Sequence, residues 1–436
     1  MSEEKIDSLV ICSTLNQITN YLMIKKYEPK TVFNITFKDN AKELNWNIKP
    51  QEWDNQLKSI CNGITRFEDI ELTTEDIYSL SDIKEKIHDN ILENVSNDKK
   101  IYWHVTGGQR TIALAISELI KDKERKNDKL LYIEGNTEIL IINTNEGELD
   151  SYEEDYGYKN LTFNEALILT GFNTKKLDST KPFKEKGKEI IKKDDKEYRF
   201  YKELYRIIHL EKESKISINY GGSNELITDT FRNLLLKSNN ISKNTEERRL
   251  FIRLLFEKLL DKYSNLREIE YYNKDNVESK DEFNQSYPAG YIFEKLTAYK
   301  IYDLIKDNPK ILGMETSLKT YFTEEKKKNA IIDELDIVLL TNTGKIINFE
   351  CKSGGMKGDN AKSHNYTTYR LAGVFGMPIL LSPLYKNEEN SDCKNENKEL
   401  EKPFQALRAA KAAELEVFTV DEIENGLRRL GIIEEN

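Results

Sequence analysis

The sequence predicts an α/β protein with three regions: a sheet-forming domain over residues 1–150, a helix-rich connector or insertion over 151–280, and a second sheet-forming domain over 281–436. Two observations lead to this fold class. In the first region, short apolar runs typical of strands alternate with helical patterns, and near residue 281 the helix-rich pattern gives way to strands again. A chain of 436 residues is long enough for two or three domains that each bury a core.

The strands expected in the first region are short runs rich in β-branched residues, and most end at a polar or glycine-containing turn. They lie at residues 8–12, 31–36, 101–105, 130–134 and 138–143, with helical patterns after residue 17, over 82–95 and over 111–120. Because strands that alternate with helices tend to pair in parallel, we expect a mostly parallel sheet with helices on both faces.

The other two regions combine helical patterns with a second group of strands. Helices are expected at 162–171, 198–210, 246–266, 291–305 and 366–375, and strands at 336–340, 345–350 and 379–381. A glycine-bearing turn at 341–344 joins the first two of these strands. Two charge-rich stretches, 184–196 and 388–402, are expected to form a linker or solvated helix and a mobile loop.

The composition excludes several classes of protein. No run of about 18 apolar residues occurs, and the N-terminus lacks the basic-then-apolar pattern of a signal peptide, so we expect a cytoplasmic protein without a membrane segment. Four widely spaced cysteines and only four histidines argue against a disulfide framework or a zinc site. The net charge of −10 argues against indiscriminate coating of nucleic acid but permits a local basic groove.

An acidic constellation in the third region points to a metal site. Glu350 and Lys352 flank Cys351 in one expected strand, and because residues i and i+2 of a strand share a face, both side chains point to one place. The preceding strand brings Asp336 alongside them. Two carboxylates with the Cys351 carbonyl suit a hard cation such as Mg²⁺ or Mn²⁺, and the lysine can orient a water or stabilise charge on a phosphate. Glu294 is expected on the opening turn of the preceding helix.

A D…ExK pattern is short, and a chain with 76 acidic residues produces it by chance. Three details favour a site over a coincidence. The carboxylates lie within apolar strands, where an unpartnered charge is costly to bury. The two strands are adjacent in sequence, and the glycines at 354 and 355 that follow the lysine would let a polyanionic backbone approach.

Residues 286–384 resemble the PD-(D/E)XK nuclease fold. The resemblance rests on residues 290–294 in the first helix, 333–338 around the metal aspartate, 349–354 around the ExK motif, and 369–378 for the helix and strand that complete the core. Leu335 stands where the proline that gives the fold its name is expected. The resemblance implies a metal-dependent nuclease in which Glu294, Asp336, Glu350 and Lys352 are catalytic.

Two turns in the first region are suited to a phosphate-bearing ligand. Glycines in the turn 106–110 let backbone amides converge at a helix N-terminus, and the turn 13–17 should lie at the same carboxyl edge of the sheet, where open α/β sheets bind ligands. Neither turn is a Walker P-loop or a GxGxxG motif, and each could also be a plain strand-to-helix turn. The candidate ligand-binding residues are Ser13, Thr14, Asn16, Gln17, Thr106, Gly107, Gly108, Gln109 and Arg110.

These turns resemble those of the CARF domain, a Rossmann-like fold of CRISPR-associated proteins. The combination with a PD-(D/E)XK domain is similar to the Card and Can nucleases of type III CRISPR defence, over about 1–150 and 281–436. This resemblance implies a homodimer that binds a cyclic oligoadenylate across its two-fold axis, with cyclic tetra-adenylate favoured, and that cleaves DNA or RNA when the ligand is bound. The middle region is not matched by it.

Three questions stay open at this stage. Basic and aromatic residues near the ExK motif suit single-stranded nucleic acid but are also ordinary surface and core residues; they are Lys357, Lys362, His364, Tyr366, Tyr369 and Arg370. An alternative is a non-enzymatic, ligand-responsive regulator whose middle region, around 216–236, binds DNA. A third hypothesis is that the first region cleaves its own ligand through Arg110. The sequence does not choose between DNA and RNA or fix the ring size.

Overall fold

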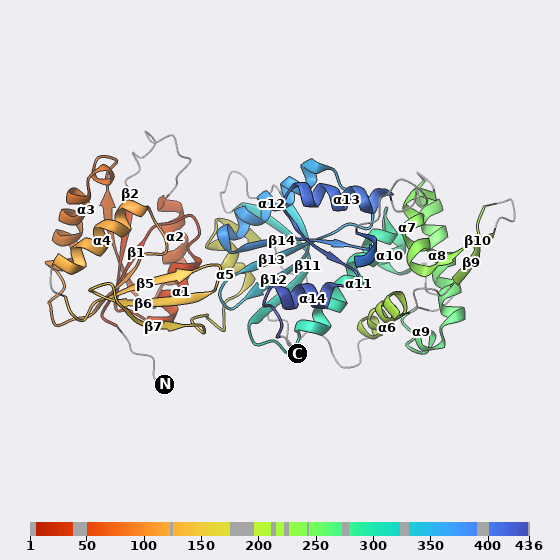
Figure 1. The fold of residues 1–436 in the computed structure, drawn as a ribbon, viewed down its shortest axis with the longest axis horizontal. Coiled ribbons are helices and arrows are strands. Elements are labelled where there is room, and N and C mark those ends of the chain that lie inside the picture. Colours follow the sequence, from red (N-terminus) through yellow and green to blue (C-terminus); the bar gives the residue numbers. More distant parts are fainter. Residues whose placement is uncertain are drawn as a thin grey trace.

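The computed structural model describes residues 6–37, 50–122, 125–174, 196–210, 215–221, 226–241, 244–272, 279–322, 331–389 and 401–434. They form an elongated molecule in which two sheets lie end to end (Figure 1). The helices of residues 196–272 lie at the far end of the second sheet, so in space they do not separate the two sheets.

The first sheet has seven strands in the order β3-β2-β1-β4-β5-β6-β7. The first five are parallel, and β6 and β7 are added antiparallel at one edge. The expected mostly parallel α/β sheet is therefore confirmed. Its elements are β1 (Ser8–Cys12), α1 (Ile18–Tyr27), β2 (Thr31–Phe37), α2 (Pro50–Ile60), β3 (Arg66–Leu72), α3 (Leu80–Ile87), the π-helical turn η3 (His88–Leu92), β4 (Ile101–His104), α4 (Arg110–Asp122), β5 (Lys129–Glu134), β6 (Ile139–Thr144) and β7 (Leu149–Glu153).

Strands β1 and β4 are neighbours, with Val10 opposite Trp103, so the turns that follow them meet at one edge of the sheet. Gly108 makes this meeting possible. Its φ is +85°, and a Cβ on it would lie 2.5 Å from the Cβ of Cys12, so any larger residue would push the second turn off the end of β1. The two expected ligand turns are therefore packed against each other.

A buried ion pair fixes the start of β4. Arg125 Nε lies 2.7 Å from Asp128 Oδ2, and both side chains are 1% exposed. The same carboxylate accepts hydrogen bonds from the indole of Trp103 at 2.9 Å and from the backbone N–H of Ile101 at 3.1 Å. The Asp128 carboxylate therefore joins a guanidinium, an indole ring and the end of a strand. Its loss would leave the buried guanidinium of Arg125 without a counter-ion.

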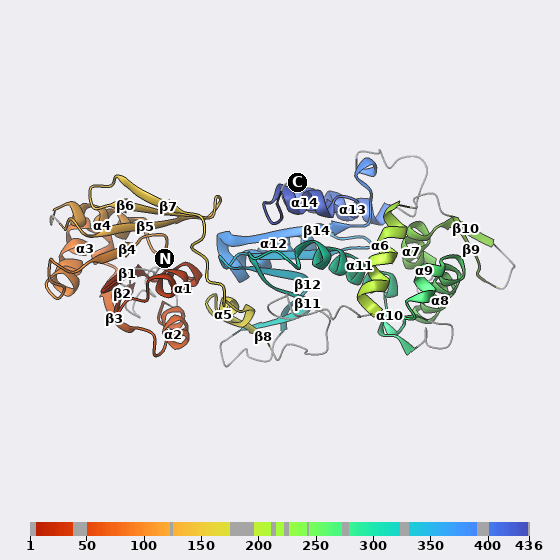
Figure 2. The ribbon, with the colours of Figure 1, turned by 90° about the horizontal axis from the view of Figure 1, so that it is seen from below.

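The second sheet has six strands in the order β15-β14-β13-β12-β11-β8. Strands β8, β11, β12 and β13 pair antiparallel, and β13, β14 and β15 pair in parallel. β8 comes from residues 172–174 and adds to the edge of this sheet beside β11 (Figure 2). The elements are α5 (Phe163–Ile168), β8 (Phe172–Thr174), α11 (Pro288–Ile305), β11 (Ile311–Phe322), β12 (Ile331–Thr341), β13 (Ile346–Cys351), α12 (Gly358–Ala372), β14 (Gly376–Ser382), α13 (Glu401–Ala412), β15 (Glu416–Thr419) and α14 (Ile423–Arg429).

Helices α11 and α12 cover opposite faces of this sheet. Neighbouring residues of β13 point to opposite faces, and each contacts a different one of the two helices. Phe349 belongs to the same hydrophobic cluster as Ile292 and Leu296 of α11. The next residue back, Asn348, donates a hydrogen bond to Thr368 Oγ1 of α12 at 2.9 Å. The end of β13 is therefore reached by side chains from both helices.

The middle region packs against this second sheet. Its elements are α6 (Lys196–Leu210), β9 (Lys215–Asn219), β10 (Leu226–Thr230), α7 (Phe231–Ile241), α8 (Thr245–Lys262), α9 (Ser264–Glu268) and α10 (Asp281–Asn284). One hydrophobic cluster runs from Phe200 and Phe256 of these helices through α11 to Phe349. Tyr385, after β14, donates a hydrogen bond to the carbonyl of Ile208 at 2.7 Å.

Two expected segments, 184–196 and 388–402, lie almost entirely outside the described residues. Lys196 opens α6, and the short turn η8 (Lys386–Glu388) and α13 border the second segment. Within the described part of the chain, no helix is both long and apolar enough to cross a membrane.

We predict that Asp128→Asn lowers the free energy of unfolding of the first domain by about 3–5 kcal/mol, because Arg125 stays buried without its counter-ion. Tryptophan fluorescence isolates this domain, since the three tryptophans of the chain are at positions 46, 53 and 103. The denaturation midpoint and slope give the change in free energy. Lys30→Gln is the control: Lys30 is 80% exposed, and we expect a shift within about 0.5 kcal/mol. An unchanged midpoint for Asp128→Asn would contradict the prediction.

Candidate functional site

The acidic residues expected to form a metal site come together on neighbouring strands. Ile337 of β12 pairs with Phe349 of β13, which places Asp336 beside the end of β13. The backbone N–H of Cys351 donates to Asp336 Oδ2 at 2.8 Å, and Lys352 forms an ion pair with Glu350. Asp336 lies in the middle of β12 and does not open it, because the strand already begins at Ile331 to pair with β11.

Glu294 reaches the same place from α11. Pro288 occupies the first position of this helix, so the helix begins earlier than expected and Glu294 lies in its second turn. Ser317 of β11 donates a hydrogen bond from Oγ to Glu294 Oε1 at 3.0 Å. Ser317 has a φ of +48°, a left-handed conformation that costs free energy for a residue other than glycine. The strained backbone lies at the point of β11 that faces Asp336.

The charges at this place are unbalanced. Burial, followed by the negative charges of Glu350 and Glu294, raises the pKa of Asp336 well above its usual range, and Lys352 offsets this only in part. Burial alone would lower the pKa of Lys352, but Glu350 and Asp336 outweigh it and raise the pKa. Three carboxylates thus share one lysine. This donor set fits a divalent cation, which prefers carboxylate oxygen ligands; Asp336, Glu350 and the Cys351 carbonyl would hold it.

His364 of α12 adds a side chain that sequence reasoning did not place at the metal site. Its Nδ1 lies 3.7 Å from Glu350 Oε2, on the side of the carboxylate away from Lys352. Burial lowers the pKa of His364, which favours the neutral imidazole. Glu350 is therefore paired with the lysine that follows its own strand and lies beside a histidine of the helix that covers this face.

Another group of possible metal ligands lies far from this site. His88 and Asp89 of η3 and Glu93 directly after it have ligand atoms within 4.8 Å of one another, and within the described part of the chain no other group of three or more His, Cys, Asp or Glu side chains meets this spacing. Their side chains are partly or fully exposed, and His88 Nδ1 pairs with Asp89 at 3.2 Å. Any measurement of metal binding therefore has to separate this surface cluster from the carboxylates of β12 and β13.

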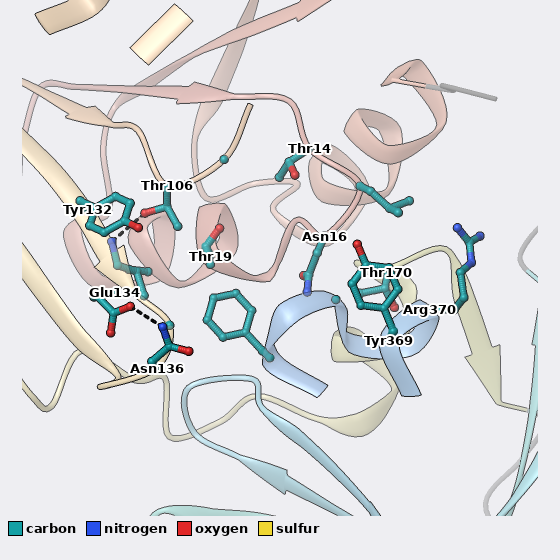
Figure 3. A pocket seen from close by; sticks show the side chains of 16 residues that line it. Thr14, Asn16, Thr19, Thr106, Tyr132, Glu134, Asn136, Thr170, Tyr369 and Arg370 are labelled. Carbon is teal, nitrogen blue, oxygen red and sulfur yellow. Dashed lines mark hydrogen bonds between the residues drawn. The ribbon is translucent and has the colours of Figure 1, made fainter. Parts of the chain in front are cut away.

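A cavity of about 430 Å³ lies where the first sheet meets α12 (Figure 3). Its volume is in the range of small-molecule sites. Four of the expected ligand-binding residues line it, namely Thr14, Asn16, Thr106 and Gly107. The remainder of the wall comes from Leu15, Thr19, Tyr132, Ile133, Glu134, Gly135, Asn136 and Thr170, and from Tyr369, Arg370, Gly373 and Phe375 of the second domain.

The other expected ligand-binding residues lie outside the lining of this cavity. Ser13 Oγ and Gln17 Nε2 donate hydrogen bonds to Asp54 Oδ1 at 2.7 and 2.9 Å, so both side chains point inward. Gln17 also accepts a hydrogen bond from Asn20 at 2.7 Å. These two residues hold the first turn in shape from below. The structure leaves Gly108, Gln109 and Arg110 at the start of α4, beside the cavity but not in its wall.

This inward network continues to His104. Asn20 donates to the carbonyl of Cys12 at 2.9 Å, and its Oδ1 lies 2.9 Å from His104 Nδ1. Burial lowers the pKa of His104 to about 3, so the imidazole is neutral. The ends of β1 and β4 are therefore joined by buried amide and imidazole groups beneath the cavity.

The residues expected to bind nucleic acid divide between two places. Lys357, Lys362 and Tyr366 are exposed along the outer side of α12 and its N-terminal end. Arg370 lies near the C-terminal end of the helix, where it lines the cavity and its guanidinium lies 5.9 Å from the ring of Phe172. The glycine pair at 354 and 355 was expected to let a polyanionic backbone approach. At Gly355 the space is already occupied by the Gln405 side chain of α13, since a Cβ on Gly355 would lie 2.7 Å from it.

No protein-family model and no curated protein sequence matches this chain. Its fold is nevertheless similar to solved structures over nearly the whole length. One is protein VC1899 from Vibrio cholerae, with a TM-score of 0.61 and 15% identity over 98% of this chain and 97% of that one. Another is Can2 from Sulfobacillus thermosulfidooxidans in complex with cyclic tetra-adenylate, with a TM-score of 0.59 and 15% identity over 97% and 96%. At this identity, what the likeness establishes is a shared fold that includes the middle region.

We predict that Asp336→Asn weakens Mn²⁺ binding by at least about 10- to 100-fold. Loss of a residue that only hydrogen-bonds to a metal ligand already lowers metal affinity by that factor. The reason is that Asp336 is the carboxylate most strongly crowded by its neighbours. Calorimetric titration of the full chain with Mn²⁺ measures the effect. Glu334→Gln, an exposed carboxylate on the same strand, is the matched control, and Asp89→Asn removes the η3 cluster. Equal affinities for Asp336→Asn and Glu334→Gln would refute the site.

Proposed function

We propose that this protein is a metal-dependent nuclease that is activated by a cyclic oligoadenylate and acts in type III CRISPR defence in the cytoplasm. The observation that carries the proposal is the meeting of Glu294, Asp336, Glu350 and Lys352 on three elements of one sheet domain. The polar cavity at the carboxyl edge of the first sheet supports the sensing half of the proposal. The fold shared with Can2, which was solved with cyclic tetra-adenylate, supports the choice of ligand.

The chemistry follows from the residues that meet at the end of β13. When bound, Mg²⁺ or Mn²⁺ supplies Lewis-acid polarisation of a phosphodiester and an acidified water. Lys352, fixed by Glu350, places a positive charge next to the carboxylates and stabilises the charge that develops on the attacked phosphate. His364 Nδ1 borders the second oxygen of Glu350 at 3.7 Å. Lys357, Lys362 and Tyr366 along α12 guide a nucleic-acid strand towards this point by charge and stacking.

The sensing half is proposed to work as a homodimer. A ring of adenylates bound across a two-fold axis would contact the same pocket in each protomer, and cyclic tetra-adenylate is the favoured ring. Activation requires that the ligand bind the active arrangement more tightly than the inactive one. The candidate residues of the two turns then divide into those that touch the ligand and those that hold the turn in shape. They are Ser13, Thr14, Asn16, Gln17 and 106–110.

The alternative of a non-enzymatic regulator has one structural feature in its favour. The segment around 216–236 forms an antiparallel hairpin, β9 and β10, followed directly by α7. A hairpin beside helices is a shape that enters a DNA groove in some proteins. This alternative expects ligand-dependent DNA binding without cleavage, which the same experiment measures.

We predict that the full chain cleaves nucleic acid when Mn²⁺ and cyclic tetra- or hexa-adenylate are both present. Plasmid, single-stranded DNA and RNA are offered together with each ring, and products are resolved on gels. Glu350→Ala should abolish cleavage, and Lys352→Met should lower the rate by about 10²-fold or more because a transition-state charge loses its partner. Glu334→Gln on the neighbouring strand should cleave normally.

Two outcomes of this experiment would count against the proposal. Cleavage by Glu350→Ala would show that the site is elsewhere. Absence of cleavage in every combination, with DNA bound when the ring is added, would favour the regulator. Loss of the ring itself during incubation, abolished by Arg110→Ala, would support the separate hypothesis that the first domain degrades its ligand.

We predict that Ser317→Ala lowers the cleavage rate by about 10- to 100-fold, the usual effect of removing an outer partner of a metal-site carboxylate. The hydroxyl orients Glu294, and the left-handed backbone at Ser317 is maintained to place it there. Ser317→Gly removes the hydroxyl while relieving the strain, so it should be as slow as Ser317→Ala but more stable. Lys319→Ala, exposed on the same strand, is the control. Full activity in both Ser317 variants would contradict the positioning role.

A further inference from the structure

The cavity at the carboxyl edge of the first sheet is closed by residues of the other domain. Thr14, Asn16, Thr106 and the β5–β6 hairpin form one wall, while Tyr369, Arg370, Gly373 and Phe375 come from the end of α12 and the turn after it. In Figure 3, Tyr369 and Arg370 lie beside Asn16 and Thr170, and Tyr132, Glu134 and Asn136 lie across from them. A ligand held by the two turns of the first sheet therefore meets side chains of the nuclease half.

The charge of the lining indicates which group of a ligand Arg370 meets. Among the lining residues of the cavity, Arg370 is the cationic side chain, and no ion pair involves it within the described part of the chain. The acidic lining residue, Glu134, is turned to its own hairpin, where it accepts hydrogen bonds from Thr137 Oγ1 at 2.7 Å and Asn136 Nδ2 at 2.9 Å. A phosphate that enters this cavity consequently has one guanidinium to pair with.

The aromatic residues of the lining are placed for a purine base. Tyr369 and Tyr132 stand on different walls of the cavity and are 55% and 41% exposed, so both rings are accessible to a ligand there. Phe375 also lines the cavity, and its ring would lie 2.9 Å from a Cβ on Gly135. Flat rings at the mouth of a polar cavity stack on bases whatever their sequence.

Helix α12 also connects this cavity with the metal site. Asn16 Nδ2 donates a hydrogen bond to the carbonyl of Ala372, the last residue of α12, at 2.7 Å. Two turns earlier on the same helix, His364 lies 3.7 Å from Glu350. A ligand that displaces or tightens the Asn16 contact therefore acts on the helix that carries His364 to within 3.7 Å of Glu350.

We propose that Arg370 and Tyr369 of the nuclease half belong to the activator pocket, with Arg370 pairing with a phosphate and Tyr369 stacking on an adenine of the ring. This assignment rests on the proposed function and moves Arg370 from the path of the nucleic-acid substrate to the sensing site. It also gives α12 a direct part in activation, because one helix contacts both the ligand and Glu350.

The test measures binding and not cleavage. Cyclic tetra-adenylate is titrated by calorimetry into the full chain and into Arg370→Gln and Tyr369→Ala variants, all in a Glu350→Gln background. Arg370→Gln should weaken binding by about 10- to 100-fold, since a charge-assisted hydrogen bond is lost. Tyr369→Ala should weaken it by about 5- to 100-fold, whereas Tyr369→Phe keeps the ring and restores it. Lys362→Gln and Tyr366→Ala, exposed on the same helix, should bind the ring normally.

A second titration with single-stranded DNA and RNA separates the two possible roles of Arg370. In our assignment, Arg370→Gln leaves affinity for these strands within about two-fold, because the pocket is not on their path, and Arg370→Lys recovers part of the ring affinity. Unchanged ring binding together with weakened strand binding would overturn the assignment while leaving the proposed function intact. If the starting chain binds no ring of four or six adenylates, the proposed function fails, and the assignment fails with it.

Discussion

The collection of three carboxylates around one lysine is the constraint on which the second domain depends. Asp336, Glu350 and Glu294 come from different elements, and their mutual repulsion is large enough to raise the pKa of Asp336 well above its usual range. Like charges gathered in a partly desolvated place persist only where the surrounding structure fixes them. Here the groups that bind them are the Cys351 amide for Asp336, the Ser317 hydroxyl for Glu294 and the Lys352 ammonium for Glu350. A cation would relieve the repulsion without moving any of them.

The same requirement explains why the middle region is attached to this sheet and not placed between the domains. Glu294 is held at the right depth only if α11 is held, and α11 packs on one side against the sheet and on the other against α6 and α8. A continuous apolar cluster from Phe200 to Phe349 makes these helices a support for α11. Lys295, next to Glu294, is drawn away from the carboxylates by Glu282 at 3.1 Å and by Glu197, both from this support. The support thus keeps a second lysine from neutralising the metal site.

How much the sequence predicted depended on how local each signal was. The strands β1, β2, β4 and β12 to β14 were expected because apolar runs are local, and the D…ExK residues met because their strands are consecutive. β11 was missed: it contains Gly313 and the left-handed Ser317, and its pairing with β12 spans a segment without any hairpin signal. Tyr369 and Arg370 could not be assigned to a cavity from sequence, since the contact of Asn16 with Ala372 joins residues 356 positions apart. Such contacts follow from the packing of whole domains, which no local pattern encodes.

In the proposed activation, the position of α12 determines how the first domain can act on the carboxylates of the second. A helix whose end contacts the first sheet and whose middle contacts Glu350 transmits a displacement along its axis, because a hydrogen-bonded helix is stiff over 15 residues. At its C-terminal end, a hydrogen bond from Asn16 reaches the carbonyl of Ala372, and the side chains of Leu371 and Ala372 join the cluster that spans both domains. In the proposed activation, a small shift of the Asn16 contact would change the geometry at Glu350 while the apolar interface stays intact. Sub-ångström changes at a packed boundary are sufficient to alter a metal site, since ligand geometry tolerates little error.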